Sequence, residues 1–305
     1  MARIGLIDVD GHHFPNLALM KISAYHKKKG DDVEWCIPLK QYDIVYQRKV
    51  FDKTYSEDID FTPQAKQIIK GGTGYGLENF LPDEIEHMFP DYSLYSELTK
   101  NTAYGFLTRG CPRQCHFCIV SEKEGRKSHK VANVQEFWDG QKYIKLLDAN
   151  ILACKEHMEL LQQLADTKAY VDFTQGLDAR LLTEQNIEML NKIKKKEVHF
   201  AWDYMSESDK IIQGLQLYKN LANSKPHGHY ATVYCLVNYN TTMDENLYRI
   251  NTLRDMGYAP YVMVYNKPSA PKDIKMLQRW VNNKVIFHTV SKFEDYQRSM
   301  KAKKE

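Results

Sequence analysis

The sequence predicts an α/β protein in which a small Rossmann-like α/β domain precedes a partial (β/α)6 barrel of the TIM type. Strand and helix patterns alternate twice, over about the first 75 residues and again over 101–284. Strand–helix–strand order implies parallel strands joined by crossover helices. The second series has six such units, fewer than the eight of a complete barrel. A boundary near residue 95 separates the predicted domains 1–95 and 96–305.

The first series begins with an apolar run that ends in acidic residues. A helix should follow over 16–30, because its apolar residues have helical spacing and Gly30 suits a helix end. Further strands are expected at 32–38, 43–51 and 66–72, and the glycine-rich GGTGYG occupies 71–76. Residues 77–100 are rich in Pro, acidic and aromatic residues, which predicts a linker that packs on the surface.

The second series has longer and more regular elements. Strands are expected at 102–109, 143–151, 170–177, 197–205, 229–238 and 259–266. Helices are expected at 131–140, 154–166, 183–196, 208–221, 243–257 and 273–284.

Composition indicates an ordinary soluble globular protein, with 43% hydrophobic and 27% charged residues. No apolar run is long enough to span a membrane, and the first residues lack a signal-peptide pattern. We therefore expect a cytoplasmic protein. The net charge of +3 is too small to indicate nucleic-acid binding. Lysine clusters at 192–197 and 301–305 fit solvated helix ends or weak contacts with phosphates, so nucleic acid stays open as a partner.

The cysteines are unevenly distributed. Cys36, Cys154 and Cys235 lie singly in apolar stretches and fit small buried hydrophobic residues. Cys111, Cys115 and Cys118 have the spacing C-x3-C-x2-C, directly after the strand expected at 102–109. In a cytoplasmic chain such crowding indicates metal or redox chemistry.

Three close thiolates can hold three irons of a cubane cluster and leave the fourth iron open to a ligand. A structural zinc site is an alternative, because His116 or His129 could complete a Cys3His set. An electron-transfer cluster would need Cys154 or Cys235 to fold back as a fourth ligand. Zinc is disfavoured because the chain has no second C-x-x-C pair.

The segment LTRGCPRQCHFCIVSEKEG resembles the signature of the radical S-adenosylmethionine (radical SAM) superfamily, including the aromatic Phe117 before the third cysteine. The resemblance implies a six-unit partial barrel and a 4Fe-4S cluster on Cys111, Cys115 and Cys118. It further implies that S-adenosyl-L-methionine (SAM) chelates the open iron and is cleaved to a radical that abstracts hydrogen from substrate. An external electron donor, flavodoxin-like or ferredoxin-like, is implied as a partner.

Active-site groups of such barrels lie at the carboxyl ends of the strands. The candidates for SAM binding by this rule are Asp148, Asn150, Gln175, Asp178, Arg180, Asp203 and Tyr265, with Val262 as an alternative to Tyr265. The resemblance itself implies that Phe117 lies near the adenine of SAM. Arg180 could pair with the SAM carboxylate, and Asp203 could reach the ribose hydroxyls. The alternative is that strand-end polar groups only cap local structure, as Asp178 or Thr183 could do.

The first ~80 residues resemble the cobalamin-binding domain that precedes many radical SAM barrels. The segment DVDGHHFP at 8–15 lacks the Asp-x-His-x-x-Gly motif, so cobalamin is a doubtful cofactor and a scaffold over the barrel mouth is the alternative. GGTGYG lacks the spacing of a dinucleotide fingerprint.

The predicted function is thus a radical SAM enzyme acting on an unidentified substrate, with methyl transfer as one possible outcome. Methylthiolation would need a second cluster, for which the N-terminal module offers only Cys36. The competing prediction is a non-catalytic zinc or iron–sulfur binding protein with weak nucleic-acid contact.

Overall fold

The structure is a computed structural model that describes residues 1–11, 13–226 and 230–302. His12, the first residue of the strand expected at 229–238 and the end of the C-terminal lysine cluster lie outside the described residues. The chain divides into two compact units, Met1–Asp148 (unit 1) and Ala149–Glu305 (unit 2). The predicted domains 1–95 and 96–305 stay a prediction.

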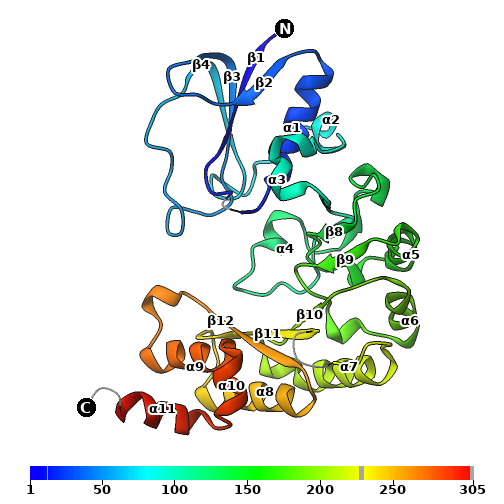
Figure 1. Ribbon diagram of the computed structural model, residues 1–305, viewed down its shortest axis with the longest axis vertical. Coiled ribbons are helices and arrows are strands. Elements are labelled where there is room, and N and C mark those ends of the chain that lie inside the picture. The colour runs from blue at the N-terminus through cyan, green and yellow to red at the C-terminus, as the bar shows by residue number, and fades with distance from the viewer. Residues whose placement is uncertain (12, 227–229, 303–305) are drawn as a thin grey trace. The chain divides into compact units, whose positions relative to one another are not determined.

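Unit 1 begins with a parallel sheet of order β2-β1-β3-β4 (Figure 1). Its strands are β1 (Arg3–Asp8), β2 (Asp32–Trp35), β3 (Gln41–Arg48) and β4 (Gln64–Gly71). Helix α1 (Leu17–Lys28) joins β1 to β2, and Asn16 caps it by accepting a hydrogen bond from the Leu19 backbone. Leu19 and Ile22 of α1 are buried together with Ile4 and Leu6 of β1. This burial fixes the helix on one face of the sheet.

The rest of unit 1 is made of short elements. The expected linker forms α2 (Asp83–Glu86), a 3-10 helix at Tyr92–Tyr95 and α3 (Ser96–Thr99). The strand expected at 102–109 is split into β5 (Thr102–Gly105) and β6 (Thr108–Arg109). They are followed by α4 (Val120–Lys123), β7 (His129–Lys130), a 3-10 turn at Val134–Glu136 and β8 (Tyr143–Leu146). Strand β5 pairs in parallel with β8.

Unit 2 alternates strands and helices. Its strands are β9 (Tyr170–Phe173), β10 (Val198–Ala201), β11 (Ala231–Val237) and β12 (Ala259–Val264). Its main helices are α5 (His157–Thr167), α6 (Glu184–Lys192), α7 (Ser208–Leu221), α8 (Met243–Asp255) and α9 (Lys272–Asn282). The chain then continues through α10 (Lys284–Thr289) and α11 (Phe293–Ala302). Short 3-10 turns lie at Ile151–Ala153, Ala179–Leu181, Met205–Glu207 and Lys267–Ser269.

Strands β10, β11 and β12 form a parallel sheet whose two faces differ. Along β11, Val233, Cys235 and Val237 are fully buried, and the residues between them are partly exposed. Helices α7, α8 and α9 lie on one side of this sheet (Figure 1). The alternation therefore leaves a second face, with the partly exposed Tyr234 and the exposed Tyr261, that is less completely covered.

The predicted α/β class with parallel sheets is confirmed, and the partial barrel stays a prediction. One expected helix is much shorter than predicted: 131–140 forms only the turn at Val134–Glu136. Asn133 caps that turn in a capping box, and Gly140 adopts a positive φ soon after it, so the local sequence starts and stops the helix within one turn. Within the described residues, none of the helices has the length and apolar character needed to cross a membrane.

Candidate cluster and cofactor site

The three neighbouring cysteines lie on a loop whose ends are joined by the antiparallel pair β6–β7. Inside this pair, the Cys111 backbone N–H donates to the Gly125 carbonyl (3.1 Å), and the Cys118 N–H donates to the Cys115 carbonyl (2.9 Å). Gly110 has a φ of +85°, and a Cβ there would lie 2.3 Å from the Lys127 carbonyl oxygen. Only glycine fits this position, so the backbone path into the loop is fixed.

The thiols themselves are accessible. Cys111 and Cys115 are partly buried and Cys118 is exposed. Among the residues that the structure describes, no three His, Cys, Asp or Glu side chains converge in a geometry ready for a metal ion. Thiolates remain the donor set that iron–sulfur clusters use. The loop therefore places three thiols of the right chemistry on a fixed backbone, and the cluster itself stays a prediction.

Asp148, at the end of unit 1, is committed to local hydrogen bonds. Its carboxylate accepts from the backbone N–H groups of Leu107 and Thr108 and from the Thr108 hydroxyl. Burial raises the pKa of this carboxyl to about 6, against the opposing effect of these hydrogen bonds. The group joins the end of β8 to the start of β6, and its predicted contact with SAM stays a prediction.

In unit 2, three predicted residues from two loops form one network. Asn150 donates to Asp178 (3.0 Å), and Arg180 donates to the same carboxylate through Nε (2.7 Å) and Nη2 (3.1 Å). Arg180 Nη1 also lies 3.6 Å from Glu207 Oε2. Asp178 caps the turn at 179–181, as the structural alternative predicted. Bidentate pairing sets the plane of the guanidinium and holds the arginine beside the end of β9.

Asp203 follows β10 and accepts a hydrogen bond from the Leu236 backbone (3.0 Å). Burial raises the pKa of its carboxyl, opposed by that hydrogen bond and by the charges of Arg249 and Arg180. Arg249 of α8 is fully buried and donates to the Trp202 and Leu236 carbonyls and to Asn246. Sequence reasoning missed Arg249, although a charge on the apolar side of a helix was a usable signal.

The remaining candidates are more peripheral. Gln175 is exposed in the turn after β9, and Phe117 is partly buried within the cysteine loop. Tyr265 is 42% exposed and packs edge-on against Tyr239. Val262 of β12 is fully buried in the hydrophobic core. Of the two alternatives on the last strand, Tyr265 is the accessible one.

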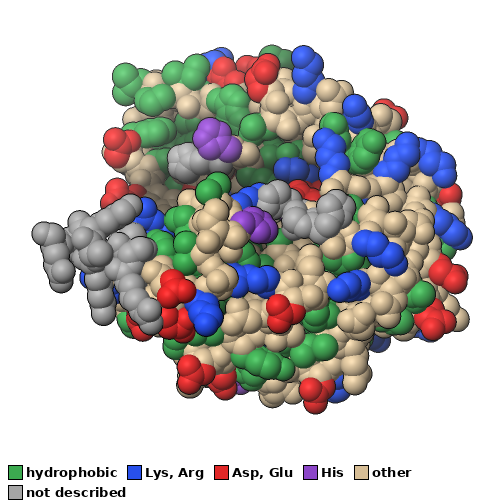
Figure 2. Space-filling view, turned by 60° about the horizontal axis from the view of Figure 1, so that its bottom comes forward, with side chains coloured by type: hydrophobic (Ala, Val, Ile, Leu, Met, Phe, Trp, Pro, Cys, Tyr) green, Lys and Arg blue, Asp and Glu red, His purple; other side chains and the backbone are tan. Residues whose placement is uncertain are grey.

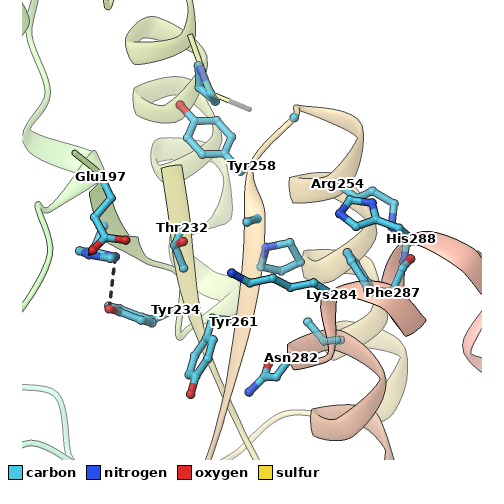
Figure 3. Close-up of a pocket in the computed structure, with 16 residues that line it drawn as sticks. Glu197, Thr232, Tyr234, Arg254, Tyr258, Tyr261, Asn282, Lys284, Phe287 and His288 are labelled. Atoms are coloured by element: carbon cyan, nitrogen blue, oxygen red, sulfur yellow. Dashed lines mark hydrogen bonds and ion pairs between the residues drawn. The ribbon is translucent and has the colours of Figure 1, made fainter. Parts of the chain in front are cut away.

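A cavity of about 630 Å³ in unit 2 was not predicted. Figure 3 shows it over the first residues of β10, β11 and β12, with the Tyr234 and Tyr261 rings beside each other and Lys284 reaching across the strands. His199 Nδ1 lies 3.2 Å from the Tyr234 hydroxyl, and the two rings stack. Aromatic and basic side chains make up much of the lining of this cavity. It lies at the start of the strands, whereas the predicted residues lie at their ends.

Figure 2 shows one face on which Lys and Arg side chains stand among acidic and polar ones. Acidic side chains are also present in this view.

Comparison with known proteins identifies no family for this chain. No family model matches the sequence, and no curated protein matches it. Among solved structures, the chain is similar to Streptococcus suis SuiB bound to the precursor peptide SuiA, at 10% identity and a TM-score of 0.42. The match covers 70% of this chain and 53% of the SuiB chain. Since a likeness this low says nothing of what a chain acts on, the function rests on the site alone.

Proposed function

We propose that the protein is a radical SAM enzyme in which Cys111, Cys115 and Cys118 hold a 4Fe-4S cluster. The observation that carries the proposal is their C-x3-C-x2-C spacing on one loop, which follows the parallel strand β5 and the short strand β6. Backbone hydrogen bonds and Gly110 set the path of that loop. With three thiolates on three irons, the fourth iron is left open to SAM. The cluster and SAM together would supply reductive cleavage and a radical able to abstract a hydrogen atom from the substrate.

The chain's own residues would bind and orient the nucleotide. In unit 2, the Arg180 guanidinium has the geometry to pair with a carboxylate, because Asp178 already sets its plane. Asp203 offers an acceptor at the end of β10 that suits ribose hydroxyls. Tyr265 offers an accessible aromatic face that suits a purine ring.

Anaerobic reconstitution with iron and sulfide tests the proposal. We expect about four irons per chain, absorption at about 400 nm, and 5′-deoxyadenosine from SAM after reduction. Cys115→Ala should lose both cluster and cleavage. Cys36→Ala is the matched control, because Cys36 is also partly buried in unit 1 but lies outside the loop. One tightly bound zinc per chain without SAM cleavage would establish the competing zinc-protein function instead.

The substrate and the fate of the radical are separate questions. Running the cleavage assay with and without cobalamin tests whether the N-terminal module uses that cofactor. A methylated product that needs cobalamin would identify methyl transfer. Replacing the chemical reductant with a flavodoxin or ferredoxin tests the expected electron donor. The radical SAM proposal itself fails only if reduced, reconstituted protein leaves SAM intact.

A further inference from the structure

A second cavity, of about 840 Å³, lies within unit 1. Its wall includes the last residue of β3 (Arg48), the glycine turn that follows β4 (Gly72, Thr73) and residues beside the cysteine loop (Arg109, Lys123). In open parallel sheets, ligands bind outside the carboxyl ends of the strands where the strand order reverses. The order β2-β1-β3-β4 reverses between β1 and β3, where Asp8 and Arg48 are in register.

Arg48 is the unusual residue of this wall. Its side chain lines the cavity, yet the residue is only 5% exposed. Its Nε has no hydrogen-bond partner within the described part of the chain, and no carboxylate there contributes to its pKa, which burial lowers. A buried cation without a partner is costly, so folds rarely keep one without a use.

Arg249 in unit 2 provides the comparison. It is fully buried and its Nε also lacks a partner, but its Nη1 and Nη2 donate to the carbonyls of Trp202 and Leu236. Those contacts explain Arg249 as a structural clamp. Arg48 has no such contacts among the described residues, so structure alone does not account for its charge.

The surroundings accommodate the guanidinium without neutralising it. A Cβ on Gly71 would lie 1.6 Å from Arg48 Nη1, so glycine makes room for the charged group. The acidic residues of the wall are already engaged. Glu86 pairs with Lys21 (2.8 Å), and Glu124 pairs with Arg109 (2.6 Å).

The other acidic residues of the wall, Asp83 and Glu136, both lie near His87, at 3.5 Å and 3.2 Å. Lys123 adds a second cation without a carboxylate partner at hydrogen-bond distance. Its Nζ donates to the Leu77 and Asn79 carbonyls and lies 3.9 Å from the Phe80 ring centroid. The wall thus keeps positive charge that its own acidic residues do not neutralise.

We propose that this cavity binds a small molecule that carries a phosphate or carboxylate group, with Arg48 as its anchor. Apolar side chains, among them Leu81, Phe106 and Val131, also line the cavity and would cover the body of the ligand. The anion would complete the hydrogen bonding of the guanidinium and remove the cost of its burial. This site does not depend on the cluster or on SAM cleavage.

The test uses the full-length protein without cluster. Thermal unfolding is followed in inorganic phosphate, in acetate and in chloride at equal ionic strength, for wild type, Arg48→Met and Arg3→Met. Arg3 is the matched control, because it lies at the opposite end of the same sheet and donates to the Gln41 carbonyl. We expect phosphate or acetate to raise the midpoint for wild type and Arg3→Met. Which anion acts shows whether the ligand group is a phosphate or a carboxylate.

Arg48→Met should bind the active anion at least about tenfold more weakly. In chloride, the reference condition, Arg48→Met should be as stable as wild type or more stable, because an apolar side chain replaces an unpartnered buried charge. If Arg48 had a structural role instead, Arg48→Met would be less stable than wild type in chloride. The proposal is overturned if neither anion stabilises wild type, if Arg48→Met responds like wild type, or if Arg48→Met unfolds in chloride.

Discussion

The cysteine loop and the strand-end network of unit 2 are built in opposite ways. In the loop, hydrogen bonds and Gly110 fix the backbone, whereas Cys118 is exposed and the other two thiols are only partly buried. In the network, the side chains are already engaged, as in the bidentate pairing of Arg180 with Asp178.

Cluster ligands and polar ligand sites thus depend on the local sequence to different degrees. Ligands for a soft metal cluster can come from a few consecutive residues, because the cluster itself draws the thiolates together. A site for a polar organic ligand must be preorganised, because a single hydrogen bond or ion pair to the ligand is too weak to pull a protein side chain into place. Such a site needs residues that only the tertiary fold brings together.

The largest effect is expected from bending the loop while keeping all three thiols. Gly110→Ala places a Cβ 2.3 Å from the Lys127 carbonyl oxygen at a φ of +85°. The backbone must move, and we expect reconstituted iron to fall from about four atoms to below about one per chain. Iron and sulfide analysis after anaerobic reconstitution measures this.

Gly140→Ala is the matched control for Gly110→Ala. Gly140 has nearly the same φ, +84°, but an added Cβ would have no neighbour within 4 Å. It therefore carries the conformational strain without the clash. Equal iron loss in both variants would mean that the loop backbone is not what positions the thiols.

The next largest effect is expected on the stability of unit 2, where the buried Arg249 supports the end of β10. Arg249→Met leaves the Trp202 and Leu236 carbonyls without their donor and removes a charge that acts on Asp203. We expect a loss of about 3 kcal/mol in the free energy of unfolding, measured by urea denaturation. The exposed Arg279→Met on α9 should stay within about 0.5 kcal/mol of wild type. A loss that small for Arg249→Met would show that the carbonyls find other donors.

The sequence predicted the secondary-structure elements better than it predicted the hydrogen-bond network of unit 2. Alternation of strand and helix patterns gave the parallel α/β class, and Thr183 caps α6 in a capping box as its sequence suggested. The short turn at 134–136 was missed because its stop signals lie so close to its start. Arg249 stands out as a charge on the apolar side of its helix, but its partners, the Trp202 and Leu236 backbone carbonyls, are known only from the fold.

The network can be tested as a ligand site through Arg180. Arg180→Gln keeps a polar side chain but removes the charge that would pair with a carboxylate, so SAM should bind about 10–30-fold more weakly to reconstituted protein. Equilibrium dialysis measures this binding, and Arg279→Gln is the exposed control on the same unit. Unchanged affinity would leave Arg180 with the structural role of holding Asp178, the cap of the turn at 179–181.

The smallest expected effect concerns Asp148, whose buried carboxyl has its pKa raised to about 6 in the folded state. Between about pH 4 and 6 the folded chain keeps a proton that the unfolded chain releases, so this group favours folding less as pH rises. From pH 5 to pH 7, wild type should lose about 1 kcal/mol relative to Asp148→Asn.

Urea denaturation of both proteins across that range measures the difference for Asp148. Thr108→Val should extend the window upward, because it removes the hydroxyl that donates to the carboxylate and so holds its pKa down. A pH-independent difference between wild type and Asp148→Asn would mean that Asp148 stays ionised in the fold. In that case the hydrogen bonds from the Leu107 and Thr108 backbone N–H groups and the Thr108 hydroxyl would together outweigh the burial of the carboxylate.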